Sequence, residues 1–170
     1  EVFKNLIHFE DTLKEDLDET FERFEFNHPI YILFSSGTTG KPKCITHGTG
    51  NVLIEHNKEF MLHCDIRDNE KLFYYTTTGW MMWNWLVGGL ATGSSIFLFD
   101  GAPVYPKIDT LLEYCQNKNI NLFGVSAKYI DHLKNEKYNS KNLDLSSIKI
   151  ITSTGSPLAE ESFKYVYENI

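Results

Sequence analysis

Cysteine is scarce in this sequence, and its arrangement argues against two classes of small protein. The 170 residues contain three cysteines, Cys44, Cys64 and Cys115, which are far apart and form no Cys-x-x-Cys pair. An odd number of widely spaced cysteines is typical neither of a disulfide-stapled secreted domain nor of a structural zinc site. We therefore expect reduced thiols, no metal site built from cysteine, and a cytoplasmic protein.

Long hydrophobic runs are also missing. The most apolar stretch, WMMWNWLVGGLA, is interrupted by Asn84, Gly88 and Gly89. It is shorter than the roughly 18 residues that indicate a membrane-spanning helix. The first residues show no cationic and then apolar leader. We expect neither a membrane partner nor secretion.

Excess positive charge is the third absence. The chain has 16 lysines and arginines against 23 acidic residues, so its formal net charge is −7. A nucleic-acid partner requires a basic face, and we expect none here. The 42% of hydrophobic residues is typical of a globular protein and sufficient for one domain with a core.

Short apolar runs alternate with amphipathic stretches along most of the chain. Residues 1–28 form a polar lead-in with one or two short helical turns, and 29–170 form one α/β subdomain. Strands are predicted over 29–36, 44–48, 71–77, 94–100, 120–126 and 148–154. Helices are predicted over 50–66, 81–92, 107–119, 127–137 and 158–170.

This order predicts an α/β fold with a largely parallel sheet and helices on both faces. The continuous apolar run at 29–36 favours a strand buried on both sides. Ligands of such folds bind at the carboxyl ends of the strands, so we expect the loops there to share one edge. On the helix at 50–66, the apolar residues predicted to lie close to one face are Val52, Leu53, Phe60, Met61 and Cys64.

The loop SSGTTGKPK after the first strand is the leading candidate for a phosphate site. Glycines let successive backbone N–H groups converge on an anion, while hydroxyls and lysines add hydrogen bonds and charge. Its pattern differs from the Walker A loop, since Pro42 follows Lys41 where a hydroxyl residue is required. A solvated hairpin turn is the alternative. The candidate residues are Ser35, Ser36, Gly37, Thr38, Thr39, Gly40, Lys41 and Lys43.

The stretch TTTGWMMWNW is unusually rich in tryptophan and methionine. Side chains of this kind after a strand end line pockets for small apolar or acyl groups. The alternative is a core helix packed beneath the sheet, which we favour for Trp83 and Trp85. Trp80, Met81 and Met82 are nearer the strand end and are the pocket candidates.

The stretch STGSPL closes the last predicted strand. Its small residues would let a flat base lie against the backbone. Ser156 and Pro157 are also suited to the N-cap and first position of the next helix, and the two interpretations are compatible.

Together these stretches resemble a known family. YILFSSGTTGKPK resembles the phosphate loop of the adenylate-forming enzymes, which include acyl-CoA synthetases, luciferases and peptide-synthetase adenylation domains. Within that superfamily the resemblance is strongest to the acetoacetyl-CoA synthetases, through HGTGNVLIEHNKE, the run from FYYTTTGW to FDGAP, and TSTGSPL. It extends over residues 5–170.

The resemblance implies part of the large domain of an ATP-dependent, AMP-forming ligase. A carboxylate, acetoacetate, would attack ATP to give an acyl-adenylate, and coenzyme A would then displace AMP, with Mg²⁺ accompanying the nucleotide. Ser36–Gly40 and Lys41 would hold the β- and γ-phosphates, with Thr39 nearest the metal-bound phosphates. Alternatively, Lys43 has a structural role in the second strand. Trp80, Met81 and Met82 would line the acyl pocket, and Gly155, Ser156 and Pro157 would lie against adenine.

Some family features differ or are missing. Ser156 stands where acetyl-CoA synthetases have a glutamate, and their valine and threonine after the tryptophan are replaced by Met81 and Met82. The family's magnesium-binding glutamate, ribose-binding aspartate, hinge and catalytic lysine do not occur in these residues. We therefore expect a fragment without activity of its own. The alternatives are a short-chain acyl-CoA synthetase, such as an acetyl-CoA synthetase, and a non-catalytic nucleotide-binding module.

Overall fold

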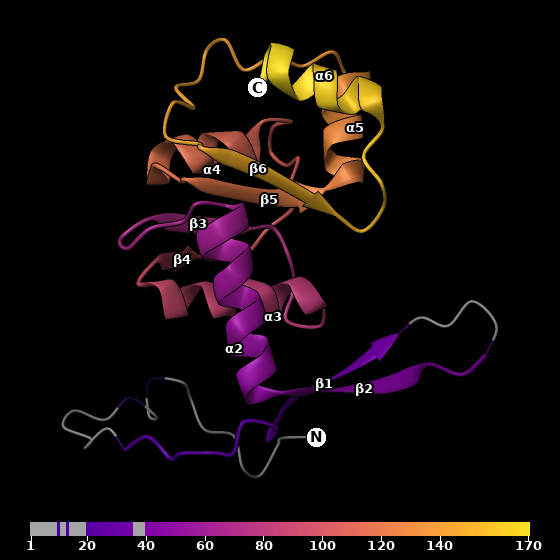
Figure 1. Ribbon diagram of the computed structural model, residues 1–170. Coiled ribbons are helices and arrows are strands. Elements are labelled where there is room, and N and C mark those ends of the chain that lie inside the picture. Colours follow the sequence, from indigo (N-terminus) through magenta and orange to yellow (C-terminus); the bar gives the residue numbers. More distant parts are fainter. Residues whose placement is uncertain (1–9, 11–12, 14–19, 36–39) are drawn as a thin grey trace.

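The computed structural model describes Glu10, Leu13, residues 20–35 and residues 40–170 (Figure 1). Within the polar lead-in, Glu10 is helical and residues 20–28 contain a turn and no helix, while the other lead-in residues apart from Leu13 lie outside the described ones. The structure contains a two-stranded hairpin and a separate four-stranded sheet. The hairpin stands away from the larger sheet, beyond the far end of α2 (Figure 1).

The larger sheet is parallel, as predicted. Its strands are β3 (Lys71–Tyr74), β4 (Ser95–Phe97), β5 (Leu122–Ser126) and β6 (Ile150–Thr154), in the order β4-β3-β5-β6. All three strand pairs are parallel. The carboxyl ends of these strands therefore lie along one edge, where α/β folds bind their ligands.

Helices cover both faces of this sheet, which confirms the predicted fold class. Alternation along the strands sends Leu72 and Leu122 to one face and Phe73 and Phe123 to the other. The first face packs on η1 (Lys58–His63) and α3 (Met81–Gly88), which contact α2 (Thr49–Asn57) and η2 (Gly89–Thr92). The second packs on α4 (Thr110–Lys118), α5 (Ala127–Asn135) and α6 (Glu160–Asn169).

The first predicted strand is not a buried member of the parallel sheet, and this expectation was wrong. β1 (Pro29–Ser35) pairs antiparallel with β2 (Lys43–Gly48) alone. Ile32 and Phe34 are 59% and 69% exposed, because no second layer of described residues covers that side of the hairpin. The shared edge therefore holds the loops after β3, β4, β5 and β6, whereas the loop after β1 belongs to the separate hairpin.

The long helix predicted at 50–66 also differs from the structure. It runs as α2 and continues as a π-helix, in which the Cys64 N–H bonds to the Glu59 carbonyl at 2.9 Å. In a π-helix each backbone N–H bonds to the carbonyl five positions earlier, so each turn holds more residues than a turn of α-helix. Residues after the π-helix are therefore rotated away from the face that a 3.6-residue period predicts. Phe60 and Cys64 are buried, whereas Leu53 and Met61 are 52% and 47% exposed.

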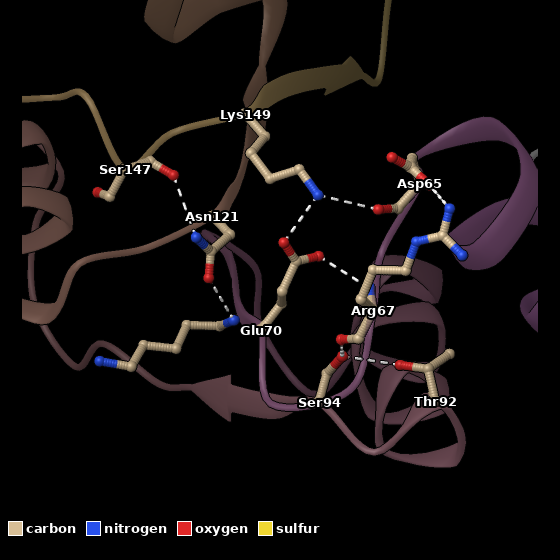
Figure 2. Close-up of polar contacts among 9 residues, drawn as sticks. Asp65, Arg67, Glu70, Thr92, Ser94, Asn121, Ser147 and Lys149 are labelled. Atoms are coloured by element: carbon tan, nitrogen blue, oxygen red, sulfur yellow. Dashed lines mark hydrogen bonds and ion pairs between the residues drawn. The ribbon is translucent and has the colours of Figure 1, made fainter.

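The amino ends of three strands are joined by Asn121, just before β5. Its side-chain oxygen accepts a hydrogen bond from the Lys71 backbone N–H at 2.8 Å, and its side-chain nitrogen donates to the Ser147 carbonyl at 3.1 Å (Figure 2). Its backbone carbonyl accepts from the Lys149 N–H at 2.8 Å. One side chain thus ties the starts of β3 and β6 to β5.

An ion pair strengthens the same end of the sheet. The Lys149 ammonium lies 2.7 Å from the Glu70 carboxylate and donates to the Asp65 backbone carbonyl at 3.0 Å (Figure 2). The other Glu70 oxygen accepts from the Arg67 N–H at 2.8 Å. These contacts order the amino end of the sheet and leave the carboxyl end available for a ligand.

Candidate functional site

A cavity of about 760 Å³ lies at the carboxyl end of β6. Its walls come from the hairpin, from α2 and α3, and from the final residues of β6. Most of its surface is apolar, and its lining includes Leu33, Val52, Met81, Met82 and Trp85. A largely apolar cavity with a few polar groups is typical of a small-molecule site.

A hydrogen bond beside the cavity depends on a glycine in the sheet. Gly124 lies beside Tyr74 in the strand register, and a Cβ at Gly124 would come within 2.0 Å of the Tyr74 ring. Without that Cβ, the ring passes over β5, and its hydroxyl lies 2.9 Å from the Thr154 hydroxyl on β6. The same Tyr74 hydroxyl donates to the Val125 carbonyl at 3.1 Å.

Tyr74 is held in its protonated form. Burial raises the pKa of the Tyr74 hydroxyl, and its hydrogen bond with Thr154 offsets only part of this rise. The hydroxyl therefore has a proton to give to the Val125 carbonyl, and its oxygen can accept the proton of Thr154.

The last three side chains of β6 alternate between two cavities. Thr152 and Thr154 line the large cavity, whereas Ser153 lines a second one of about 550 Å³ on the other side. The Thr152 and Ser153 hydroxyl oxygens are buried without a hydrogen-bond partner among the described residues. Such atoms are rare in folded proteins. Sequence reasoning missed Tyr74, Thr152 and Thr154, although hydroxyl residues two apart at a strand end are a usable signal.

The predicted phosphate loop lies at the tip of the hairpin. Ser35 ends β1 and is paired with Lys43, which begins β2, while Gly40 and Lys41 precede that strand and are exposed. Ser36, Gly37, Thr38 and Thr39 lie outside the described residues. The position of Lys43 in the strand matches its structural alternative, and phosphate binding by the loop stays a prediction.

The predicted acyl-pocket residues stand at the start of α3. Met81 and Met82 line the large cavity. Trp80 is the N-cap residue of α3, is 60% exposed and is absent from the cavity lining. Trp85, which we expected in the core, packs on Phe60 with 4.1 Å between ring centroids and also lines the cavity.

The predicted adenine segment directly follows β6. Ser156 and Pro157 line the second cavity. Gly155 has φ of +91°, which favours glycine, and no atom would lie within 4 Å of a Cβ there. Its backbone is therefore open to a flat ligand.

The expectation that Ser156 and Pro157 start the last helix was wrong. α6 begins at Glu160 with Ala159 as its N-cap residue. Leu158 packs on the main core while the chain is still extended, so the helix begins only after this contact is made. Two glutamates in the first turn then favour the positive end of the helix dipole.

The described residues offer no cluster of three or more metal-ligating side chains and no helix long and apolar enough to cross a membrane. All three cysteines are free thiols. His56 lies against Gly88 of α3, and burial lowers the pKa of its imidazole.

Known proteins resemble this chain over most of its length. The family described as AMP-binding enzyme matches residues 3–169. Acetoacetyl-coenzyme A synthetase of Rhizobium meliloti (strain 1021) is 53% identical over 151 residues, covering 88% of this chain and 23% of that protein. Malonamoyl-CoA synthetase vrtB of Penicillium aethiopicum is 41% identical over 163 residues, covering 87% of this chain and 22% of that protein.

A solved structure confirms the fold. Acetoacetyl-CoA synthetase from Streptomyces lividans superposes with a TM-score of 0.84 at 41% identity, covering 91% of this chain and 24% of that one. The chain thus spans less than a quarter of the length of these relatives. With nearly all of its residues matched by the family, this chain belongs to the AMP-binding enzymes.

Proposed function

We propose that this chain is part of an enzyme that activates acetoacetate with ATP and transfers it to coenzyme A. In the first step a carboxylate oxygen attacks the α-phosphorus of ATP and pyrophosphate leaves. In the second step the thiol sulfur of coenzyme A attacks the acyl carbon and AMP leaves. The observation that carries the proposal is the apolar cavity lined by Met81 and Met82, set between the hairpin and the end of β6.

The hairpin supports a role in the first step. Phosphoryl transfer requires positioning and charge neutralisation rather than a protein nucleophile. Ser35, Gly40 and Lys41 flank the loop tip, where backbone N–H groups, hydroxyls and one ammonium would hold the departing pyrophosphate. The remaining loop residues proposed for this role are Ser36, Gly37, Thr38 and Thr39, with Lys43 at the start of β2.

The adenine of ATP is proposed to lie on Gly155, Ser156 and Pro157. The open Gly155 backbone and its place directly after β6 support this assignment. Mg²⁺ would accompany the phosphates. The described residues contain no side-chain cluster suited to the ion, and we assign it no step.

Acetoacetate is the proposed acyl substrate, and two observations support it: the acyl groups named in the relatives and the lining of the cavity. The acyl groups named in two relatives, acetoacetyl and malonamoyl, both carry a second carbonyl on the carbon next to Cα. Flexible methionines at 81 and 82 suit such a group, and Trp80 is proposed to cover the entrance. A cytoplasmic location, which fits three free thiols, belongs to the same proposal.

The test compares three acids with the full-length protein. Acetoacetate, acetate and butyrate are supplied in turn, and acid-dependent ATP–pyrophosphate exchange and acyl-CoA formation are measured. We expect the highest kcat/KM with acetoacetate. A preference for acetate would contradict the substrate assignment and favour an acetyl-CoA synthetase, while exchange with none of the acids would favour a non-catalytic nucleotide-binding module.

A further inference from the structure

We propose that the Thr152 hydroxyl selects acyl groups that carry an oxygen on the β carbon, by donating a hydrogen bond to that oxygen. This inference rests on the proposed function and adds a specificity-determining residue to it. Thr152 lies on β6 in register with Gly124 and lines the large cavity with Met81 and Met82.

The first argument is an unmet hydrogen bond. Of the cavity-lining residues that the structure describes, Thr152 alone has a side-chain oxygen or nitrogen that is buried and without a partner. Leaving a buried hydroxyl unpaired costs about 1–3 kcal/mol, so a ligand oxygen that pairs with it recovers this penalty. An alkyl group at the same place would recover nothing.

The second argument follows the protons of the neighbouring hydroxyls. The single proton of Tyr74 is donated to the Val125 carbonyl, so the Tyr74 oxygen must accept the proton of Thr154. Thr154 is left with lone pairs only. A carbonyl oxygen needs a donor, and of the β6 residues that line the large cavity, Thr152 is the one whose hydroxyl proton is not already donated.

The third argument concerns access. The Thr152 oxygen is covered at present, but rotation about χ1 moves it to another staggered position. Because Thr152 lines the large cavity, such a rotation can turn the hydroxyl toward a bound acyl group. A substrate oxygen at the Thr152 side of the cavity is therefore matched by a donor at small conformational cost.

The experiment uses the full-length enzyme and the ratio of kcat/KM for acetoacetate to that for butyrate, which has the same carbon chain without the keto oxygen. Thr152→Val keeps the shape and removes the donor. We expect the ratio to fall roughly tenfold to a hundredfold, through acetoacetate alone. Thr152→Ser keeps the hydroxyl and should preserve the ratio within about threefold.

Ser153→Ala is the matched control, since Ser153 also has a buried, unpartnered hydroxyl but faces the other cavity. It should leave the ratio unchanged, and none of the three variants should lower the unfolding temperature. An unchanged ratio in Thr152→Val, or equal losses with both acids, would overturn the inference. A wild-type enzyme that does not activate acetoacetate would instead contradict the proposed function.

Discussion

Two residues show how the surroundings of a side chain decide its chemistry. Lys41 is exposed at the end of the hairpin loop, where its charge can meet an anion. His56 lies between α2 and α3, with its ring against Gly88 and edge-on to Phe60. The exposed Lys41 ammonium is suited to binding a charged ligand, whereas the surroundings of His56 favour the neutral form of its imidazole.

Lys41→Ala should impair adenylate formation by the full-length enzyme. Removing one charge-assisted contact to the pyrophosphate costs roughly 1.5–3 kcal/mol, which is about a tenfold to 150-fold loss in kcat/KM for ATP. The measurement is acetoacetate-dependent ATP–pyrophosphate exchange, with the exposed Lys141→Ala as the matched control. Equal rates in both variants would remove Lys41 from the phosphate site.

His56 should make the protein less stable in mild acid. Burial lowers its pKa below the usual 6.5, even though Glu55 and Glu59 oppose this shift. The folded state therefore binds fewer protons than the unfolded state, and its stability falls as the pH drops from about 6.5 toward the lower folded-state pKa.

Urea unfolding of the full-length protein between pH 5 and pH 8 measures this effect. His56→Gln should flatten the dependence of the free energy of unfolding on pH. His63→Gln, at an exposed position, should retain it. If the free energy of unfolding of His56→Gln depends on pH as strongly as that of the wild type, other groups cause the loss of stability in acid.

At the scale of elements, the site depends on how three strands lie beside one another. Tyr74 on β3, Gly124 on β5 and Thr152 on β6 are register neighbours, and the Tyr74 hydroxyl reaches Thr154 across the gap that glycine leaves. At the opposite end of the strands, Asn121 ties their starts together. The sheet is thus joined at one end and shaped for a ligand at the other.

Gly124→Ala should destabilise the full-length protein by displacing the Tyr74 ring. Forcing a methyl group into a filled site costs about 1–3 kcal/mol in the free energy of unfolding. Gly79→Ala is the control, because its Cβ would meet nothing closer than 3.9 Å. In a double-mutant cycle with Tyr74→Ala, the penalty should shrink, since the ring that clashes is gone. Strictly additive penalties would show that the contact is unimportant.

At the scale of the whole molecule, the chain leaves large apolar side chains uncovered. Phe34 on the hairpin is 69% exposed, and Phe163 and Tyr167 on α6 are 53% and 89% exposed. The parts of the relatives that match this chain are less than a quarter of their own length. These surfaces therefore provide contact area for further parts of such a protein.

The isolated segment 1–170 should show no acetoacetate-dependent ATP–pyrophosphate exchange, whereas the full-length protein should show it. The segment contains the proposed phosphate, acyl and adenine contacts, whereas the resemblance implies that the magnesium-binding, ribose-binding and catalytic lysine residues lie outside it. Circular dichroism of the segment would establish that it is folded in the assay. Exchange by the folded segment would contradict this prediction.

The sequence by itself determined the alternation of strands and helices, the parallel sheet and the family. Each of these follows from local patterns, such as the apolar runs ending at Tyr74 and Ser126 and the loop before Lys41. Only the tertiary structure showed that β1 leaves the sheet and that η1 shifts the buried face, because both depend on which surfaces are available to pack. It also decided that Thr152 keeps a free proton. Tyr74 pairs with Thr154 instead, because Gly124 lets its ring pass over β5, and this contact between residues distant in sequence is encoded by no local pattern.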